Sequence, residues 1–192
     1  KNRLGIDNKL IRNITEKAQQ NPKRVVFTDG DTYRVLKASQ ILVEEGIAKP
    51  ILLGPKKQIL KMIDQYQLGI EDIQIVDPIA EEELLESYSK RLWESRKRKG
   101  VTLYEAKKLM KKREYFASMM VESGDADACI SGLTIKYASA VKPILEVIGE
   151  HAVHLDTMFD NHWEEPMKKW FQDKFNLPVN TVSAYYNYED YN

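Results

Sequence analysis

The sequence predicts an α/β fold with a parallel sheet of four or more strands and helices on both faces. Short runs of β-branched and apolar residues alternate with longer stretches whose apolar residues recur at helical spacing. These short runs are continuously apolar, which is typical of parallel strands buried on both faces. The strands are expected near residues 25–28, 50–54, 73–77 and 126–130.

The first 46 residues show this alternation clearly. Residues 7–20 predict an amphipathic helix that ends before Pro22, with one apolar face formed by Leu10, Ile11, Ile14 and Ala18. Arg24 to Phe27 predicts the first strand. A second helix follows, with an inward face of Val35, Leu36, Ser39 and Leu42. Gly46 is expected to end this helix as a glycine C-cap.

The loop between this strand and helix holds the first candidate ligand-binding residues: Asp29, Gly30, Asp31 and Arg34. Open parallel sheets bind ligands at the carboxyl ends of their strands. Arg34 lies in the first helical turn, where the helix dipole favours an anion, so it is the expected phosphate contact. Two structural explanations remain open: an ion pair of Arg34 with the two acids, and capping of the helix by Asp31 or Thr32.

The middle of the chain continues the pattern and then becomes helical. Pro50 to Gly54 predicts a strand, residues 55–66 a helix, and Ile73 to Val76 a third strand. Helices are expected over 80–98 and from Thr102 to about Ser123, the second beginning with a capping box of Thr102 and Glu105. Basic residues cluster in these helices, and either a solvated surface or an anion site for a phosphorylated ligand explains them.

A second strand, glycine loop and helix follow. Asp127 to Ile130 predicts the fourth strand, and a helix over about 134–148 contains Pro143. The loop adds Ser131, Gly132 and Thr134 to the candidate ligand-binding residues. Both glycine loops are expected at the same edge of the sheet, where glycine allows backbone N–H groups to approach a phosphate or acyl oxygen.

Composition limits the classes of partner. The 192 residues include 29 basic and 29 acidic side chains, which argues against nucleic acid as a main partner. The single cysteine, Cys129, excludes an internal disulfide and suits a reducing compartment, so a cytoplasmic location is expected. No apolar run has the length of a membrane span, and no membrane partner is expected. A chain that begins at Lys1 without methionine is expected to be part of a longer protein.

Residues 150–192 differ in character and are expected to form an extension packed on the domain of residues 1–149. Three histidines, His151, His154 and His162, lie close to Asp156 and Asp160. A divalent metal site is one explanation, but no helical metal-ligand spacing appears, so surface or capping histidines are preferred and no metal is predicted. An aromatic stripe is expected to be buried against the sheet or a partner chain, and comprises Trp163, Met167, Trp170, Phe171 and Phe175.

Three stretches resemble one family. VVFTDGDTYRVLKASQILVEEGIAKPILLG and DADACISGLTIKYASAVKPILEVIG resemble the phosphate acetyl/butyryl transferase (phosphotransacetylase) family over about residues 4–149. RKRKGVTLYEAKK and the leading helix resemble a narrower relative, the C-terminal domain of bacterial NADP-dependent malic enzymes. The tail from Glu150 onward resembles neither.

The resemblance implies the Rossmann-like half of a phosphotransacetylase domain, with acetyl-CoA, CoA or acetyl phosphate as ligand and no tightly bound cofactor. It covers the loop residues above and adds Lys142, which stands where the family commonly has arginine; lysine keeps the charge but lacks the guanidinium fork. The family's second subdomain, which completes the catalytic cleft, has no counterpart here. No catalytic residue is therefore assigned, and the isolated chain is expected to be inactive.

Three functions are compatible with this sequence. The leading one is a regulatory acetyl-CoA or acyl-phosphate binding domain of a malic enzyme. The second is a phosphate acetyltransferase that completes its cleft in an oligomer, for which a homo-oligomer is the expected partner state. The third is a structural or engineered scaffold module.

Overall fold

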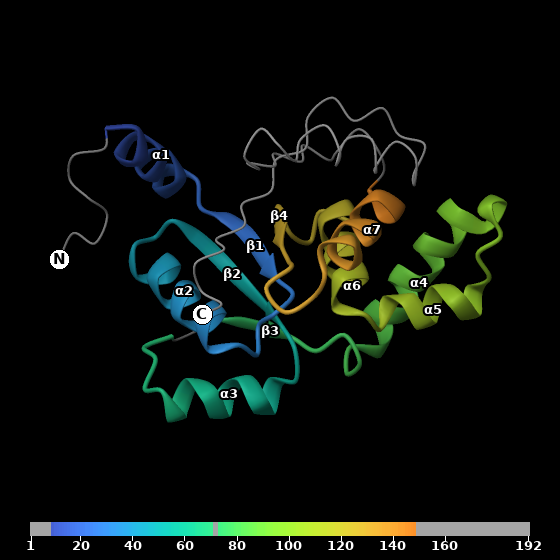
Figure 1. The fold of residues 1–192 in the computed structure, drawn as a ribbon, viewed down its shortest axis with the longest axis horizontal. Coiled ribbons are helices and arrows are strands. Elements are labelled where there is room, and N and C mark those ends of the chain that lie inside the picture. The colour runs from blue at the N-terminus through green and yellow to red at the C-terminus, as the bar shows by residue number, and fades with distance from the viewer. Residues whose placement is uncertain (1–8, 71–72, 149–192) are drawn as a thin grey trace. The chain divides into compact units, whose positions relative to one another are not determined.

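The computed structural model describes residues 9–70 and 73–148 (Figure 1). The chain divides into two compact units, Lys1–Val147 and Ile148–Asn192, and the described residues belong almost entirely to the first. The predictions for the histidines and the aromatic stripe of the tail lie outside the described residues. Among the helices of the described part, none is long and apolar enough to span a membrane.

The sheet has four parallel strands in the order β3-β2-β1-β4. The strands are β1 (Lys23–Phe27), β2 (Ala48–Leu53), β3 (Gln74–Val76) and β4 (Ala128–Ile130). All four expected strands are present and the predicted parallel pairing is confirmed. The last β1 residue, Phe27, is opposite Leu52 of β2 and Ile130 of β4, so the loops after β1 and β4 leave the sheet side by side.

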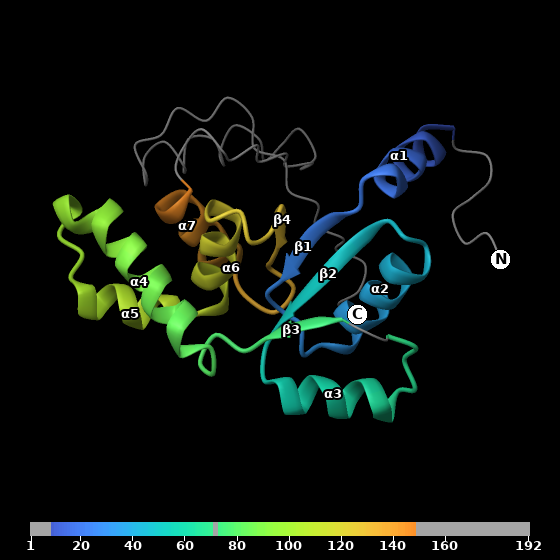
Figure 2. The same ribbon diagram turned by 180° about the vertical axis from the view of Figure 1, so that it is seen from behind.

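Helices cover both faces of the sheet, as Figures 1 and 2 show from opposite sides. The helices are α1 (Lys9–Gln20), α2 (Tyr33–Glu44), α3 (Lys56–Gln65), α4 (Glu82–Arg96), the short 3₁₀ helix η1 (Lys97–Lys99), α5 (Leu103–Met110), α6 (Arg113–Glu122) and α7 (Tyr137–Val147). Alternation along the strands separates two apolar cores, because successive side chains point to opposite faces. Phe27 and Leu52 pack with Leu36 of α2 and Ile59 of α3.

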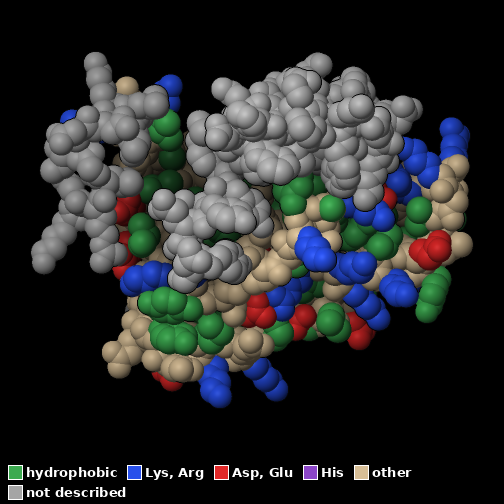
Figure 3. Space-filling model, viewed as in Figure 1, with side chains coloured by type: hydrophobic (Ala, Val, Ile, Leu, Met, Phe, Trp, Pro, Cys, Tyr) green, Lys and Arg blue, Asp and Glu red, His purple; other side chains and the backbone are tan. Residues whose placement is uncertain are grey.

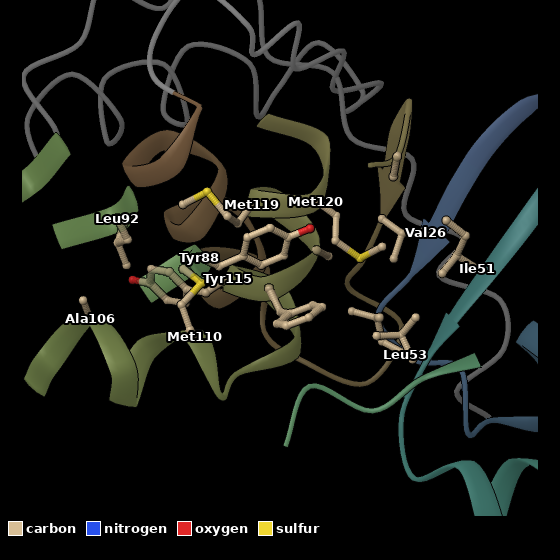
Figure 4. Packing of buried hydrophobic residues seen from close by; sticks show 14 residues of the cluster. Val26, Ile51, Leu53, Tyr88, Leu92, Ala106, Met110, Tyr115, Met119 and Met120 are labelled. Carbon is tan, nitrogen blue, oxygen red and sulfur yellow. The ribbon is translucent and has the colours of Figure 1, made fainter. Parts of the chain in front are cut away.

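The second core lies on the other face and is the larger. Val26, Ile51 and Leu53 of the sheet belong to it together with the fully or almost fully buried side chains of α4, α5 and α6. In Figure 4, Met120 reaches toward Val26 while Met119, Tyr115, Tyr88 and Leu92 fill the space between the helices. The apolar run on α6 that the sequence shows is thus buried almost all round, which holds the start of this helix firmly against the sheet.

Local chain-terminating motifs explain several element ends. Gly46 has φ +65°, and its N–H donates to Val43 O at 3.1 Å while Ile47 N–H donates to Leu42 O at 3.0 Å, so the predicted glycine end of α2 is confirmed. The capping box of α5 is also confirmed, with the Glu105 N–H donating to the Thr102 hydroxyl at 3.2 Å.

One predicted helix is wrong. The stretch expected as a single helix from Thr102 to about Ser123 is divided into α5 and α6, because Lys112 has extended backbone angles of φ −84° and ψ 131°. No glycine or proline marks this break in the sequence. The break turns the chain so that Arg113, the first residue of α6, reaches the loop after β1.

At the amino ends of β1 and β4, Arg24 joins the two strands. Its guanidinium donates to both carboxylate oxygens of Asp127, at 2.9 and 3.2 Å, and to the carbonyls of Gly124 and Asp125. The side-chain hydrogen bond from Arg24, followed by that from its backbone N–H, lowers the pKa of Asp127 to about 2.

We expect Asp127→Asn to be less stable than the wild type near pH 6, with a difference that narrows as the pH falls from about 4 to about 2. The carboxylate has a lower pKa in the folded than in the unfolded chain. Its contribution is therefore present above the unfolded pKa and is lost as the pH falls through the folded value. Urea unfolding of both proteins at several pH values measures the difference, and a constant difference would contradict this assignment.

Candidate functional site

The loops after β1 and β4 meet at the carboxyl edge of the sheet. Thr28 N–H donates to Ile130 O at 3.2 Å, and the hydroxyl oxygens of Thr28 and Ser131 are hydrogen-bonded at 2.9 Å. Thr28 is 1% exposed, so this contact lies at the floor of the edge. The two glycine loops that the sequence places at one edge are therefore adjacent.

Asp29 links the two loops. Its carboxylate accepts hydrogen bonds from the Thr134 hydroxyl, from Leu133 N–H at 3.3 Å and from the Thr28 hydroxyl at 3.2 Å. The residue is only 6% exposed. Hydrogen bonds of this kind compensate a buried carboxylate for lost hydration. Asp29 therefore fixes the backbone of the Ser131–Thr134 loop.

Asp31 makes a two-pronged ion pair with Arg113. Nη1 and Nη2 of Arg113 donate to the two carboxylate oxygens at 2.6 and 2.8 Å. Side-chain exposures of 30% for Arg113 and 19% for Asp31 leave the pair partly shielded from water. The hydrogen bonds from Arg113 lower the pKa of Asp31, and those to Asp31 raise the pKa of Arg113.

Arg113 also touches the neighbouring strands. Its Nη1 lies 3.4 Å from Thr28 O, and its guanidinium carbon lies 3.5 Å from where a Cβ on Gly54 would be, just beyond β2. The ion pair thus joins the start of α6 to the ends of β1 and β2. In the sequence, Arg113 is one of the clustered basic residues of the helical stretch and has no mark that distinguishes it from the others. No local pattern could have linked it to Asp31, which lies 82 positions earlier.

The structural explanations offered for Arg34 and for capping need correction. The carboxylate of Asp31 accepts its hydrogen bonds from Arg113, and that of Asp29 from hydroxyl and N–H donors. The predicted ion pair of these two acids with Arg34 is therefore not what orders the loop. Thr32 is the N-cap of α2, but its hydroxyl donates to Asp29 O at 2.8 Å and makes no side-chain cap. Arg34 itself is exposed in the first turn of α2. Its role as a phosphate contact stays a prediction.

The two loop glycines have different requirements. A Cβ on Gly30 would lie 2.7 Å from Leu53 O and 2.9 Å from the Cβ of Leu52, so Gly30 allows the loop to pass directly over β2. Gly132 has φ +110°, a conformation that side chains strongly disfavour. Close packing and backbone conformation thus require glycine here, independently of any phosphate.

Lys142 belongs to a different group of contacts. Its ammonium lies 3.9 Å from the carboxylate of Glu146 on the same helix, α7. Glu146 also pairs with Arg96 of α4 at 3.5 Å and accepts a hydrogen bond from the Tyr115 hydroxyl of α6. The candidate residues Asp29, Asp31, Ser131 and Thr134 are brought together with Arg113, whereas Lys142 lies in this interhelical network.

The groups at this edge of the sheet can orient a ligand by hydrogen bonds and can neutralise its negative charge. Hydroxyls, backbone N–H groups and guanidinium groups are the donors that proteins use for phosphate and acyl oxygens. In the described part of the chain, no three Cys, His, Asp or Glu side chains group together as metal ligands would.

Comparison with known proteins identifies close relatives. Residues 9–157 match the family described as phosphate acetyl/butaryl transferase. The phosphate acetyltransferase of Thermoanaerobacterium thermosaccharolyticum is 37% identical over 139 residues, which cover 72% of this chain and 42% of that protein. The phosphate acetyltransferase of Escherichia coli is 36% identical over 138 residues, covering 70% of this chain and 19% of that protein.

Solved structures agree with the sequence relatives. A phosphotransacetylase from Streptococcus pyogenes matches with a TM-score of 0.64 and 29% identity, over 71% of this chain and 41% of that chain. A phosphotransacetylase from Staphylococcus aureus matches with a TM-score of 0.62 and 28% identity, over 74% of this chain and 43% of that chain. The chain thus spans less than half the length of these relatives. Since the family match covers most of its residues, the chain belongs to the phosphate acetyl/butaryl transferase family.

Proposed function

We propose that this chain is part of a phosphate acetyltransferase, and that the loops after β1 and β4 form one wall of the site for CoA and acetyl phosphate. The observation that carries the proposal is the hydrogen-bonded junction of these loops, fixed by Asp29 and by the Asp31–Arg113 pair, in a chain of this family. Ligands of open parallel sheets bind at this edge.

The proposed reaction needs two large anionic substrates to be held in register. The CoA thiolate attacks the acetyl carbonyl, a C–S bond forms, and the C–O bond to phosphate breaks, so that phosphate leaves with the electron pair. The chain's share is to position and to neutralise charge. The Ser131–Thr134 loop offers hydroxyl and N–H donors, and Arg34 offers a cation at a helix start.

The transferase is preferred to the regulatory domain of a malic enzyme because the reported relatives are phosphate acetyltransferases. The malic-enzyme relation stays a prediction from the RKRKGVTLYEAKK stretch. Three further expectations also stay predictions: the homo-oligomer, the cytoplasmic location and the packing of residues 150–192 on the domain.

We expect the 192-residue chain alone to produce no steady acetyl-CoA from acetyl phosphate and CoA. Much of the rate of such a transfer comes from orienting both reactants, and effective molarities of about 10⁵ M or more are lost when one wall is missing. A coupled assay beside the full-length Thermoanaerobacterium enzyme measures this. Turnover that rises in proportion to the concentration of this chain would contradict the expectation.

The ligand role of Arg34 is tested by Arg34→Ala. We expect CoA affinity, measured by calorimetry, to fall about tenfold, which corresponds to one charge-assisted hydrogen bond of about 1.4 kcal/mol. The unfolding temperature should change little, because Arg34 is exposed. Arg12→Ala on α1 is the matched control, since that arginine is also exposed and, among the described residues, pairs only with Glu16 of its own helix. Lost stability with unchanged affinity would make Arg34 a structural residue, and absence of any CoA binding by the wild type would overturn the proposed function.

A further inference from the structure

Charge is strongly segregated in this chain. Basic and acidic residues are equal in number overall, yet residues 90–113 contain eleven Lys and Arg and only two Glu. This stretch runs from the middle of α4 through η1 and α5 to the first residue of α6. Figure 3 shows several of the Lys and Arg side chains on this part of the surface.

Some of these cations have acidic partners. Lys107 pairs with Glu86 at 2.6 Å, Lys90 lies 3.6 Å from the same carboxylate, and Arg96 pairs with Glu146 at 3.5 Å. These pairs tie α4 to α5 and α7, so they have a structural purpose.

Seven of the eleven form no ion pair among the described residues, and three of these seven lie together between the last turn of α5 and the start of α6. Lys108, Lys111 and Lys112 are exposed, and within the described residues none of them forms an ion pair. They follow one another three positions and one position apart, so three positive charges lie close together along the chain between the last turn of α5 and the start of α6. Lys108 lies in the last turn of α5, where the helix dipole favours a cation, but three neighbouring cations also offer an approaching anion more than one charged donor.

The position of the three lysines connects them with the candidate site. Lys112 directly precedes Arg113, whose guanidinium lies at the carboxyl edge beside Asp31 and Thr28 O. The lysines therefore lead along the end of α5 to the edge where the two ligand loops meet. Clustered charge of one sign raises the local concentration of an oppositely charged ligand and its association rate, and salt weakens the effect.

We propose that Lys108, Lys111 and Lys112, hereafter the lysine surface, attract the phosphate groups of CoA and guide this nucleotide to the edge of the sheet. The inference rests on the proposed function, because it assumes that a polyphosphorylated nucleotide is the ligand. It adds the residues that capture the nucleotide end, which lie outside the two glycine loops.

Charge reversal tests the lysine surface. The triple variant Lys108→Glu, Lys111→Glu, Lys112→Glu is compared with the control triple Lys17→Glu, Lys23→Glu, Lys49→Glu, whose exposed lysines lie in the last turn of α1 and at the amino ends of β1 and β2, away from the carboxyl edge. Both triples change the net charge equally, so only the location of the change differs. CoA binding to the full chain is measured by calorimetry at about 20 mM and about 500 mM NaCl, where the screening lengths are about 20 and 4 Å.

We expect the lysine-surface triple to weaken CoA binding at least about tenfold at low salt and less than about threefold at high salt, with less than about a twofold change in the control. Dephospho-CoA has one phosphate fewer than CoA. The lysine-surface triple should therefore weaken the binding of dephospho-CoA by a smaller factor than the binding of CoA. A milder triple with Gln at the three positions changes the charge by half as much, so it should show about half of the low-salt effect on a logarithmic scale, and thermal unfolding shows whether each variant is folded.

Equal weakening in both triples, or no weakening in the lysine-surface triple while the wild type binds CoA, would overturn the inference and leave the proposed function intact. Absence of CoA binding by the wild type would overturn both. The two failures are therefore distinguishable in one set of titrations.

Discussion

Gly30→Ala is expected to lower the free energy of unfolding by about 3 kcal/mol. A methyl group at this position would lie 2.7 Å from Leu53 O and 2.9 Å from Leu53 N. Both are backbone atoms of a central strand whose last four residues are buried, so neither can move aside without disturbing the sheet. The change would also displace the loop that carries Asp29 and Asp31.

Gly69→Ala is the matched control for this variant. The nearest atom to a Cβ there is the amide nitrogen of Gln40 at 3.8 Å, which is an ordinary contact with a flexible side chain. We expect Gly69→Ala to change stability by less than about 1 kcal/mol. Urea unfolding of the two variants measures the contrast, and similar values for both would show that the loop can move away from β2.

Arg113→Met is expected to lower the free energy of unfolding by about 2 kcal/mol. The substitution keeps the apolar stem but leaves the Asp31 carboxylate, which is 19% exposed, without its two charged hydrogen bonds. The expected loss in the free energy of unfolding is smaller than for a completely buried pair, because Arg113 retains some contact with water. Arg12→Met should lower the free energy of unfolding much less, since its pair with Glu16 is exposed and such pairs contribute little.

A double variant shows whether the loss comes from the pair itself. Asp31→Asn combined with Arg113→Met removes both charges, so it should be destabilised by less than the sum of the two single variants. Strict additivity in urea unfolding would mean that the two side chains stabilise the fold separately and that the edge is not organised by their contact.

Features of this structure that depend on residues close together in the sequence could be predicted, whereas those that depend on contacts between distant positions could not. The four strands, Gly46 and the Thr102–Glu105 capping box follow from patterns within a few residues, and each is present. The break at Lys112 could not be predicted from its neighbours, because the contact that it accompanies joins Arg113 to a loop 82 positions away. Local propensity alone favours a continuous helix there.

The candidate site shows the same division. Asp29, Asp31, Ser131 and Thr134 could be placed at one edge because parallel strands end together. Their partners could not be predicted: the bonds from Thr134 and Leu133 to Asp29 and the choice of Arg113 for Asp31 depend on three-dimensional packing. Arg34, the cation closest in sequence, was the natural but incorrect choice of partner for Asp31.

The strand order also determines when the edge of the sheet can form during folding. β1, β2 and β3 follow one another along the chain, but β4 joins β1 only after a stretch of about a hundred residues, as the separation of 103 positions between Arg24 and Asp127 shows. Closing so long a loop is slow, because its chain entropy is lost before the contact is made. In refolding monitored by hydrogen exchange, the β4 amides should therefore become protected after those of β1 and β2, and the junction of the loops after β1 and β4 should be assembled last.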